Sequence, residues 1–157
     1  MKNMYKNEQS GLSVLEMIGL LSIIGGIAVA ALFFVGTMMT HQKNTTLDDD
    51  LARIARGARA LYNNQPDFTN LDDGMLQFVF NDKNKKNPYD GVYHLTPNNN
   101  RTFTVRVTNL NARACTDLIQ MKFSAGGQMG GCVFDNKNPG KYYMDVTFGK
   151  EEKGQVQ

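Results

Sequence analysis

Cysteine and histidine are the residue types of this sequence that could act as a nucleophile, a base or a soft metal ligand. Cys115 or Cys132 could form a nucleophilic pair with His94, as in enzymes where an imidazole activates a thiol. A zinc site needs about four ligands at recurring spacing. The two cysteines and the two histidines, His41 and His94, are isolated and do not provide it. We therefore interpret His94 as a surface residue and expect no catalytic cysteine and no metal.

Two short runs of aspartate, Asp48-Asp49-Asp50 and Asp72-Asp73, supply carboxylates, which calcium prefers. Neither run has the spaced oxygen ligands of a calcium-binding loop. The Gly-rich segment from Ser124 to Gly131 lacks the Lys-Ser/Thr of a P-loop and matches neither common phosphate-binding fingerprint. The sequence thus predicts no cofactor, and we expect that the protein is not an enzyme.

Glu16 is the single charged residue in an otherwise apolar stretch from Gly11 to Met39. The part without charge, residues 17–39, is longer than the roughly 20 residues that an α-helix needs to cross a bilayer. A carboxylate inside such a span is costly and usually marks a functional site. The preceding residues, 1–10, are polar and contain lysine, which predicts that they lie on the cytoplasmic side.

An ordinary membrane anchor or an uncleaved signal peptide is the simplest alternative for this stretch. A secretory signal would have its cleavage site after the apolar run, at small residues. Here the break between polar and apolar residues falls at Gly11, before the run. The position of this junction favours a different kind of processing signal.

The order Gly11-Leu12-Ser13-Val14-Leu15-Glu16, followed by a long apolar helix, resembles the class III signal of type IV pilins and pseudopilins. The resemblance implies that a prepilin peptidase cuts between Gly11 and Leu12 on the cytoplasmic side. The same enzyme then methylates the new amine of Leu12. Glu16 becomes the fifth residue of the mature chain. The leucine at the new terminus and the absence of proline in the span resemble the type IVb branch more than type IVa.

The remainder of the chain, residues 41–157, is long enough for one hydrophobic core. After the apolar span, apolar residues continue to recur at helical spacing. The span and this part together predict one helix from about Leu12 to Asn63, and an interruption of it near Thr45-Thr46 is left open. The other expected elements are a short helix at 75–80, a β-hairpin over 92–108, a helix capped by Asn111, and strands at 132–134 and 142–148. We expect the Gly-rich segment 124–131 to break regular structure. The predicted fold class is α+β, a long N-terminal helix packed on a small antiparallel sheet.

Cys115 and Cys132 are an even pair, which most simply forms a disulfide if this region lies outside the cytoplasm. Several features of the region resemble the head of type IVb major pilins from conjugative thin pili. These are Asn87-Pro88-Tyr89-Asp90-Gly91, the hairpin with Phe103-Thr104-Val105, the following Asn109, and Cys115 with Leu118.

The resemblance implies a structural subunit of a type IV pilus, a homo-oligomeric helical filament used for adhesion, aggregation or conjugative contact. It implies further partners, namely the prepilin peptidase, an assembly ATPase and an inner-membrane platform. The subunit would span the inner membrane once and then become part of an extracellular pilus. The formal net charge is +2 and no Lys/Arg cluster stands out, so we expect no nucleic acid partner.

Glu16 is the residue to which we assign assembly. An ionised carboxylate among apolar side chains costs several kcal/mol unless it is paired. The amine of Leu12 in one subunit could neutralise Glu16 of another and so select the axial register. The same pair could also form within one chain.

The expected divisions are a leader at 1–11, a transmembrane and assembly helix at 12–40, and a globular head at 41–157. A minor pilin or a type II secretion pseudopilin has the same N-terminal signal and remains an alternative. A disulfide near the C-terminus mildly favours a true pilin. A membrane-anchored extracytoplasmic binding protein or enzyme is the alternative from another class.

Overall fold

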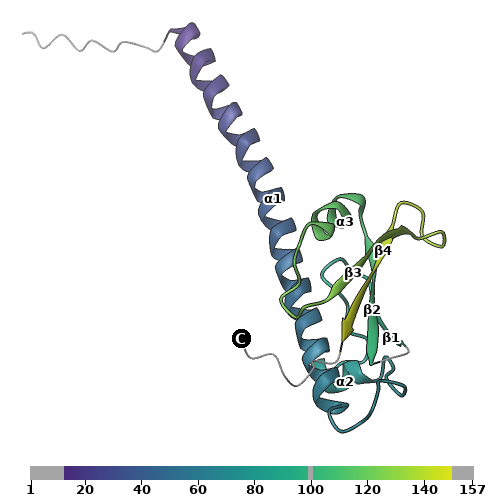
Figure 1. Ribbon diagram of the computed structural model, residues 1–157. Coiled ribbons are helices and arrows are strands. Elements are labelled where there is room, and N and C mark those ends of the chain that lie inside the picture. Colours follow the sequence, from purple (N-terminus) through teal and green to yellow (C-terminus); the bar gives the residue numbers. More distant parts are fainter. Residues whose placement is uncertain (1–12, 99–100, 150–157) are drawn as a thin grey trace, which may run out of the picture. The chain divides into compact units, whose positions relative to one another are not determined.

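The computed structural model of the 157-residue chain describes residues 13–98 and 101–149. The chain separates into two compact units, Met1–Met39 and Thr40–Gln157. The elements in chain order are α1 (Val14–Leu61), α2 (Met75–Phe80), β1 (Tyr93–Pro97), β2 (Thr102–Leu110), α3 (Ala112–Ile119), β3 (Gln128–Phe134) and β4 (Tyr142–Gly149) (Figure 1).

The helix α1 has 48 residues and contains no interruption. It ends at Leu61, close to the predicted limit, and the predicted first residue, Leu12, lies outside the described part of the chain. The break considered near Thr45-Thr46 does not occur. Both hydroxyls donate to carbonyl oxygens one turn earlier, on His41 at 3.0 Å and on Gln42 at 2.9 Å. These hydroxyls are therefore satisfied within the helix, by carbonyls four residues earlier, and the helix continues through them.

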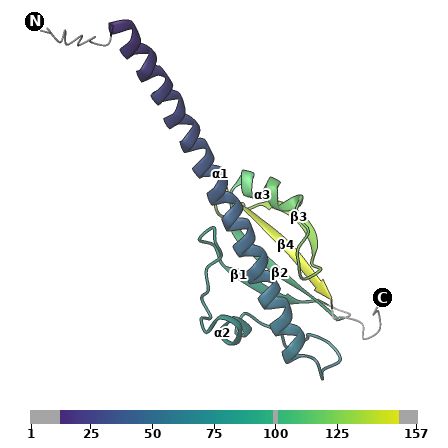
Figure 2. The ribbon, with the colours of Figure 1, turned by 90° about the vertical axis from the view of Figure 1, so that its left-hand side faces the viewer.

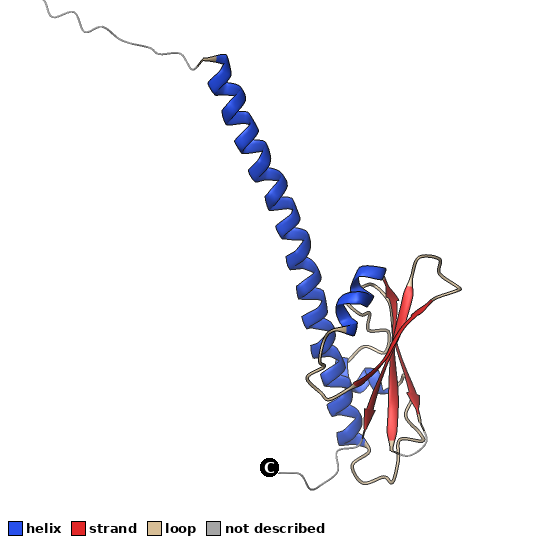
Figure 3. Cartoon of the chain, turned by 45° about the horizontal axis from the view of Figure 1, so that its top comes forward, coloured by secondary structure: helices blue, strands red, loops and turns tan. Residues whose placement is uncertain are grey.

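The four strands form one antiparallel sheet in the order β1-β2-β4-β3, shown as arrows in Figure 3. The predicted hairpin is confirmed as β1 and β2, in which Tyr93 pairs with Val107 and Pro97 with Phe103. The last strand, β4, lies between β2 and β3. The pairing of β2 with β4 therefore joins two segments that are distant in the sequence.

One face of the sheet and the second half of α1 share a single hydrophobic core (Figure 2). Inward side chains alternate along each strand, as expected for a sheet with one covered face. On β2 and β4 these are Phe103, Val105, Val107, Met144, Val146 and Phe148, and on α1 they are Leu47, Leu51, Ile54, Ala55 and Ala58. The core therefore consists of side chains at helical spacing on α1 and of side chains at every second position on the strands.

The predicted disulfide is confirmed, because Cys115 on α3 is bonded to Cys132 on β3, 17 positions later. The helix α3 starts as predicted, with the Asn111 side chain accepting a hydrogen bond from the Ala114 N–H at 2.7 Å. The bridge joins this helix to an edge strand of the sheet.

The prediction that residues 124–131 break regular structure is wrong for the second half of that segment, because β3 begins at Gln128. Its glycines allow a close approach to the core. A Cβ at Gly127 would lie 2.6 Å from side-chain atoms of Phe148 and Val146. The pairing of β3 with β4 shifts register between Met129 and Cys132, where Gly131 has a φ of +85°.

Candidate functional site

The first turn of α1 holds Glu16 in a capping box. The Ser13 N–H donates to Glu16 Oε2 at 2.9 Å, and the Leu15 N–H donates to the Ser13 hydroxyl at 3.2 Å. This is the Ser-x-x-Glu pattern of a capping box, with the Ser13 hydroxyl accepting from the second N–H of the helix instead of the third, and it satisfies free N–H groups of the helix start. The sequence pattern was visible in Ser13 and Glu16, but our reading of Glu16 as an assembly residue overlooked it.

The processing residues Gly11 and Leu12 lie outside the described residues. The cleavage and methylation assigned to them therefore stay predictions. The pairing of Glu16 with the amine of Leu12 stays a prediction as well. What the structure adds is that Glu16 already has a partner, the backbone N–H of Ser13.

The apolar stretch that follows exposes its large side chains on every side. Exposed fractions are 75% for Val14, 74% for Leu32 and 61% for Met39. Between Met17 and Met39 the polar side chains are Ser22 and Thr37, and each hydroxyl donates to a carbonyl of its own helix. The stretch thus offers no free hydrogen-bonding side chain to its surroundings.

Within the described residues, α1 is the single helix long and apolar enough to cross a membrane. The criterion is one of length and composition. A signal sequence near an N-terminus would also satisfy it. None of the most apolar window of α1 is buried within the chain, which distinguishes it from the core helix of a globular protein.

The second half of α1 is fixed to the head by buried polar contacts. Asp50 is 6% exposed and accepts a hydrogen bond from the Tyr93 hydroxyl at 2.9 Å. Lys85 Nζ lies 3.8 Å from the same carboxylate. Burial, together with the charge of Asp50, holds the pKa of the Tyr93 hydroxyl far above its ordinary value, so Tyr93 is a permanent donor. One turn and a half earlier, Asn44 accepts a hydrogen bond from the Tyr89 hydroxyl.

The segment Asn87-Pro88-Tyr89-Asp90-Gly91 forms a tight turn organised by Asn87. The Asn87 side chain accepts from the N–H groups of Tyr89 at 2.8 Å and Gly91 at 3.1 Å, and it donates to the Thr108 carbonyl at 2.9 Å. Asn109 Nδ2 donates to the Tyr89 carbonyl at 2.6 Å. A Cβ at Gly91 would lie 2.1 Å from the Thr108 carbonyl oxygen, so only glycine fits. The motif places Tyr89 against α1.

The residues considered for nucleophilic chemistry do not come together. Cys115 and Cys132 are consumed by the disulfide. His94 Nδ1 lies 2.9 Å from Asp73 Oδ2 on the surface, where both side chains are about half exposed. The described residues therefore contain no cysteine–histidine pair.

The aspartates considered for calcium point to different surroundings. Asp48 accepts from the Ser124 N–H at 3.0 Å, and Asp50 accepts from Tyr93. Asp72 accepts from the Gly74 N–H at 2.9 Å, and Asp73 accepts from the Leu95 N–H at 2.6 Å. Among residues 13–98 and 101–149, no group of three His, Cys, Asp or Glu side chains could hold a metal ion.

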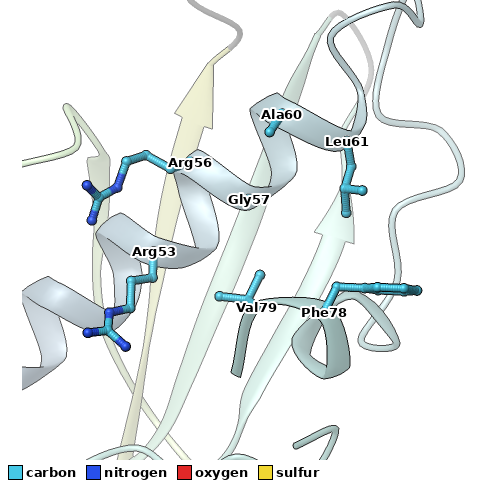
Figure 4. Close-up of a pocket in the computed structure, with 7 residues that line it drawn as sticks. All are labelled: Arg53, Arg56, Gly57, Ala60, Leu61, Phe78 and Val79. Carbon is cyan, nitrogen blue, oxygen red and sulfur yellow. The ribbon is translucent and has the colours of Figure 1, made fainter. Parts of the chain in front are cut away.

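An open groove of about 360 Å³ lies between α1 and α2 (Figure 4). Its floor is Val79 of α2, which packs under Gly57, where a Cβ would lie 2.6 Å from Val79 Cγ2. Arg53 and Arg56 project at one end. At the other end are Leu61 and Phe78, which are 51% and 79% exposed, and Ala60 completes the lining. The sequence signal for this groove was Gly57 within the helical pattern, and we did not use it.

Comparisons with protein-family models, with curated proteins and with solved structures find no match to this chain.

Proposed function

We propose that this chain is a type IV pilin, of the type IVb kind, and that it is the repeating structural subunit of a filament. The observation that carries the proposal is the junction at Gly11. A polar leader is followed by Gly-Leu-Ser-Val-Leu-Glu and then by a helix whose apolar side chains are exposed on every side. This order resembles the processing and assembly signal of that family.

The exposed apolar helix supports an assembling protein because its surface must be covered. Soluble monomers rarely expose apolar patches above a few hundred Å². Lipid can cover residues 14–39 before assembly, since a helix satisfies its own backbone and the hydroxyls of Ser22 and Thr37 are satisfied internally. Other copies of the same helix can cover this surface afterwards. A single pass through the inner membrane followed by incorporation into an extracellular pilus satisfies both requirements.

The head supports the same topology. A disulfide such as Cys115–Cys132 persists in oxidising surroundings, which favours a head outside the cytoplasm. The leader, residues 1–11, then stays on the cytoplasmic side, where a prepilin peptidase would cut before Leu12 and methylate its amine. Polymerisation would use a separate ATPase and an inner-membrane platform, as the resemblance to this family implies.

The direct test is electron microscopy of sheared surface material labelled with an antibody against the head, with mass spectrometry of the assembled subunit. We expect filaments whose subunit begins at a methylated Leu12. Gly11→Val should abolish cleavage and filaments, because a β-branched side chain replaces a hydrogen at the scissile position. Gly19→Val is the matched control for cleavage, since it makes the same substitution away from the scissile position and a Cβ at Gly19 meets no atom of the chain within 4 Å. An intact Met1 terminus in the assembled protein would contradict the proposal.

A further inference from the structure

We propose that the groove between α1 and α2 of one subunit binds the first turns of α1, residues 16–24, of a second, parallel copy of this chain. The inference deepens the proposed function, on which it rests, by naming the contact that an exposed apolar helix makes with another head. The groove belongs to the unit formed by residues 40–157, and the helix start belongs to the other unit. A copy that binds through its helix start therefore keeps its own groove free for a further copy.

The groove is charged at one end and apolar at the other (Figure 4). Arg53 and Arg56 are exposed, and neither forms an ion pair within the described part of the chain. Two cations three residues apart on a helix repel each other, and a carboxylate between them relieves that repulsion. At the other end Leu61 and Phe78 are 51% and 79% exposed, although they belong to the head. Along the direction of α1, the groove therefore fits an occupant that presents a carboxylate first and apolar side chains after it.

The start of α1 has its groups in this order. Glu16 is the charged residue of the apolar span, and the 23 residues that follow it, 17–39, contain no charge. Its Oε2 accepts from the Ser13 N–H, and its other oxygen has no partner within the described residues. Leu20 and Ile23, one and two turns later, are 48% and 62% exposed. A parallel helix therefore brings a carboxylate to the arginines and sets no charge against the apolar end of the groove.

A single lengthwise shift aligns both ends of this contact. Placing Glu16 of one copy level with Arg53 of the other requires an offset of 37 positions, roughly 55 Å of helix rise. The same offset sets Ile23 level with Ala60. Each pair of positions on one helix is seven residues apart, about two turns, so each pair shares one helix face. Because the two binding surfaces differ and the copies are displaced lengthwise, the contact is heterologous and continues from copy to copy.

The neighbouring charges agree with this register. Asp49 is exposed, lies four residues before Arg53 on the same face of α1, and forms no ion pair within the described residues. Position 12 is four residues before Glu16, and the proposed cleavage creates a positive amine there. The two surfaces thus have opposite charges in reversed order at the same spacing. Such complementarity favours one register and penalises shifts that bring like charges together.

Existing hydrogen bonds limit the cost of removing these charges from water. A buried ion pair is favourable only when its other hydrogen-bonding groups are satisfied. Glu16 keeps its bond from the Ser13 N–H, and Arg56 Nε keeps its bond to the Ala52 carbonyl at 3.2 Å. Gly19 falls level with Arg56 at the offset of 37, and a Cβ there would meet no atom of its own chain within 4 Å. The incoming helix therefore leaves room for the guanidinium beside its carboxylate.

The test is a cysteine pair, Ile23→Cys with Ala60→Cys in one chain, oxidised in intact filaments. Positions 37 residues apart on one helix cannot be bridged, because a disulfide needs Cα atoms within about 7 Å. A bond between the two new cysteines must therefore join two subunits. We expect a ladder of covalent multimers from the double variant and none from either single variant. Leu21→Cys with Ala60→Cys is the matched control, because two residues turn a helix by about 200° and place Leu21 on the side opposite Ile23.

Charge reversal in the groove is the second arm. Arg53→Glu should lower filament yield about tenfold or more, because Glu16 of the incoming copy then meets a like charge. Arg53→Lys keeps the cation and should keep the yield. Arg113→Glu is the matched control, since Arg113 is an exposed cation on α3, outside the groove. The three variants should unfold at the denaturant midpoint of the unaltered head, because both positions are exposed, so a lower yield reports assembly.

The contrary results are separable. Filaments without a ladder from the Ile23 and Ala60 pair, and with full yield from Arg53→Glu, would overturn this contact and leave the proposed function standing. An equally strong ladder from the Leu21 control would show that the helices pack without this register, and it would also overturn the contact. Absence of filaments from the unaltered chain would remove the proposed function, and this inference with it.

Discussion

The two halves of α1 are continuous in backbone and opposite in how they treat apolar side chains. From Val14 to Met39 the helix is apolar on every side and exposed on every side. From Leu47 to Ala58 it has one apolar stripe, and that stripe is buried against the sheet. The apolar side chains of the second half are covered within the chain, whereas those of the first half are not. Substitutions in the two halves should therefore affect different measurements.

The largest expected difference is between two leucines of this helix. Leu51→Ala should lower the free energy of unfolding of the head by about 2–5 kcal/mol, because Leu51 is fully buried. Leu32→Ala should leave that quantity unchanged, since Leu32 is 74% exposed. Denaturant unfolding of the full chain in detergent, followed by circular dichroism, measures both. Equal effects would mean that the apolar half also packs within the chain.

The disulfide should stabilise the head, residues 41–157, and leave the apolar half of α1 unaffected. Replacing both Cys115 and Cys132 by Ser should cost the head about 3 kcal/mol, the stabilisation expected from closing a loop of this size. The helicity of residues 14–39 should not change, because that half contains no cysteine. Thiol labelling of unfolded, unreduced protein should find no free thiol. Two free thiols would contradict both the bridge and a head outside the cytoplasm.

Neighbouring aspartates give a finer comparison within the second half. Asp50→Ala should destabilise the head by about 1–3 kcal/mol, because it leaves the Tyr93 hydroxyl buried without an acceptor. Asp49→Ala should stay within about 0.5 kcal/mol, as is usual for a surface position. A large loss of stability from Asp49→Ala would show that its carboxylate has a role within the subunit.

Tyr93 predicts how this anchor responds to alkaline pH. Its pKa in the folded head is raised above the ordinary value of 10.0 by burial and by Asp50. The protonated hydroxyl therefore contributes its full stability below pH 10, and the contribution is lost as the pH rises further. Tyr93→Phe should cost about 0.5–1.5 kcal/mol at neutral pH. Above pH 10 the variant should lose stability less steeply than the unaltered protein, and parallel pH profiles would contradict this.

Local signals in the sequence predicted most of the helices and strands. The stripe in α1, the turn residues around the hairpin and the Asn111 cap act over a few positions, so periodicity and residue type suffice to locate them. The pairing of β4 between β2 and β3 joins distant segments, and its register depends on which side chains fill the core. The position and register of β4 depend on packing between distant residues, which cannot be predicted from a short stretch of sequence.

The polar contacts show the same difference between features that local sequence predicts and features that depend on distant residues. Asp50 falls beside Leu51 and one turn before Ile54, so the helix period already placed it on the buried stripe. Its partner Tyr93 could not be identified, because the hairpin's position across α1 is a tertiary feature. The Ser13–Glu16 capping box was readable from four residues. We missed it because we interpreted Glu16 through its cost in a membrane alone.

The capping box sharpens the question of what Glu16 does in the apolar half. Glu16→Gln deletes the charge but keeps a side-chain oxygen, and glutamine also serves at the third position of a capping box. Ser13→Ala removes the N-cap hydroxyl and keeps the charge, at a cost to the helix start of about 1 kcal/mol. The two variants therefore separate charge pairing from capping. Both should still insert in the membrane, because neither adds a charge to the span.

If Glu16 acts through the amine of Leu12 in a neighbouring subunit, processed Glu16→Gln protein should fail to form filaments and Ser13→Ala should form them. An unpaired amine in a low-dielectric bundle is costly, and a glutamine does not neutralise it. If the carboxylate serves the helix start alone, Glu16→Gln should assemble normally and Ser13→Ala should be impaired. Filament yield, measured beside mass spectrometry of the cleaved N-terminus, decides between these outcomes. Normal assembly of Glu16→Gln would mean that charge pairing at Glu16 does not set the register of the filament.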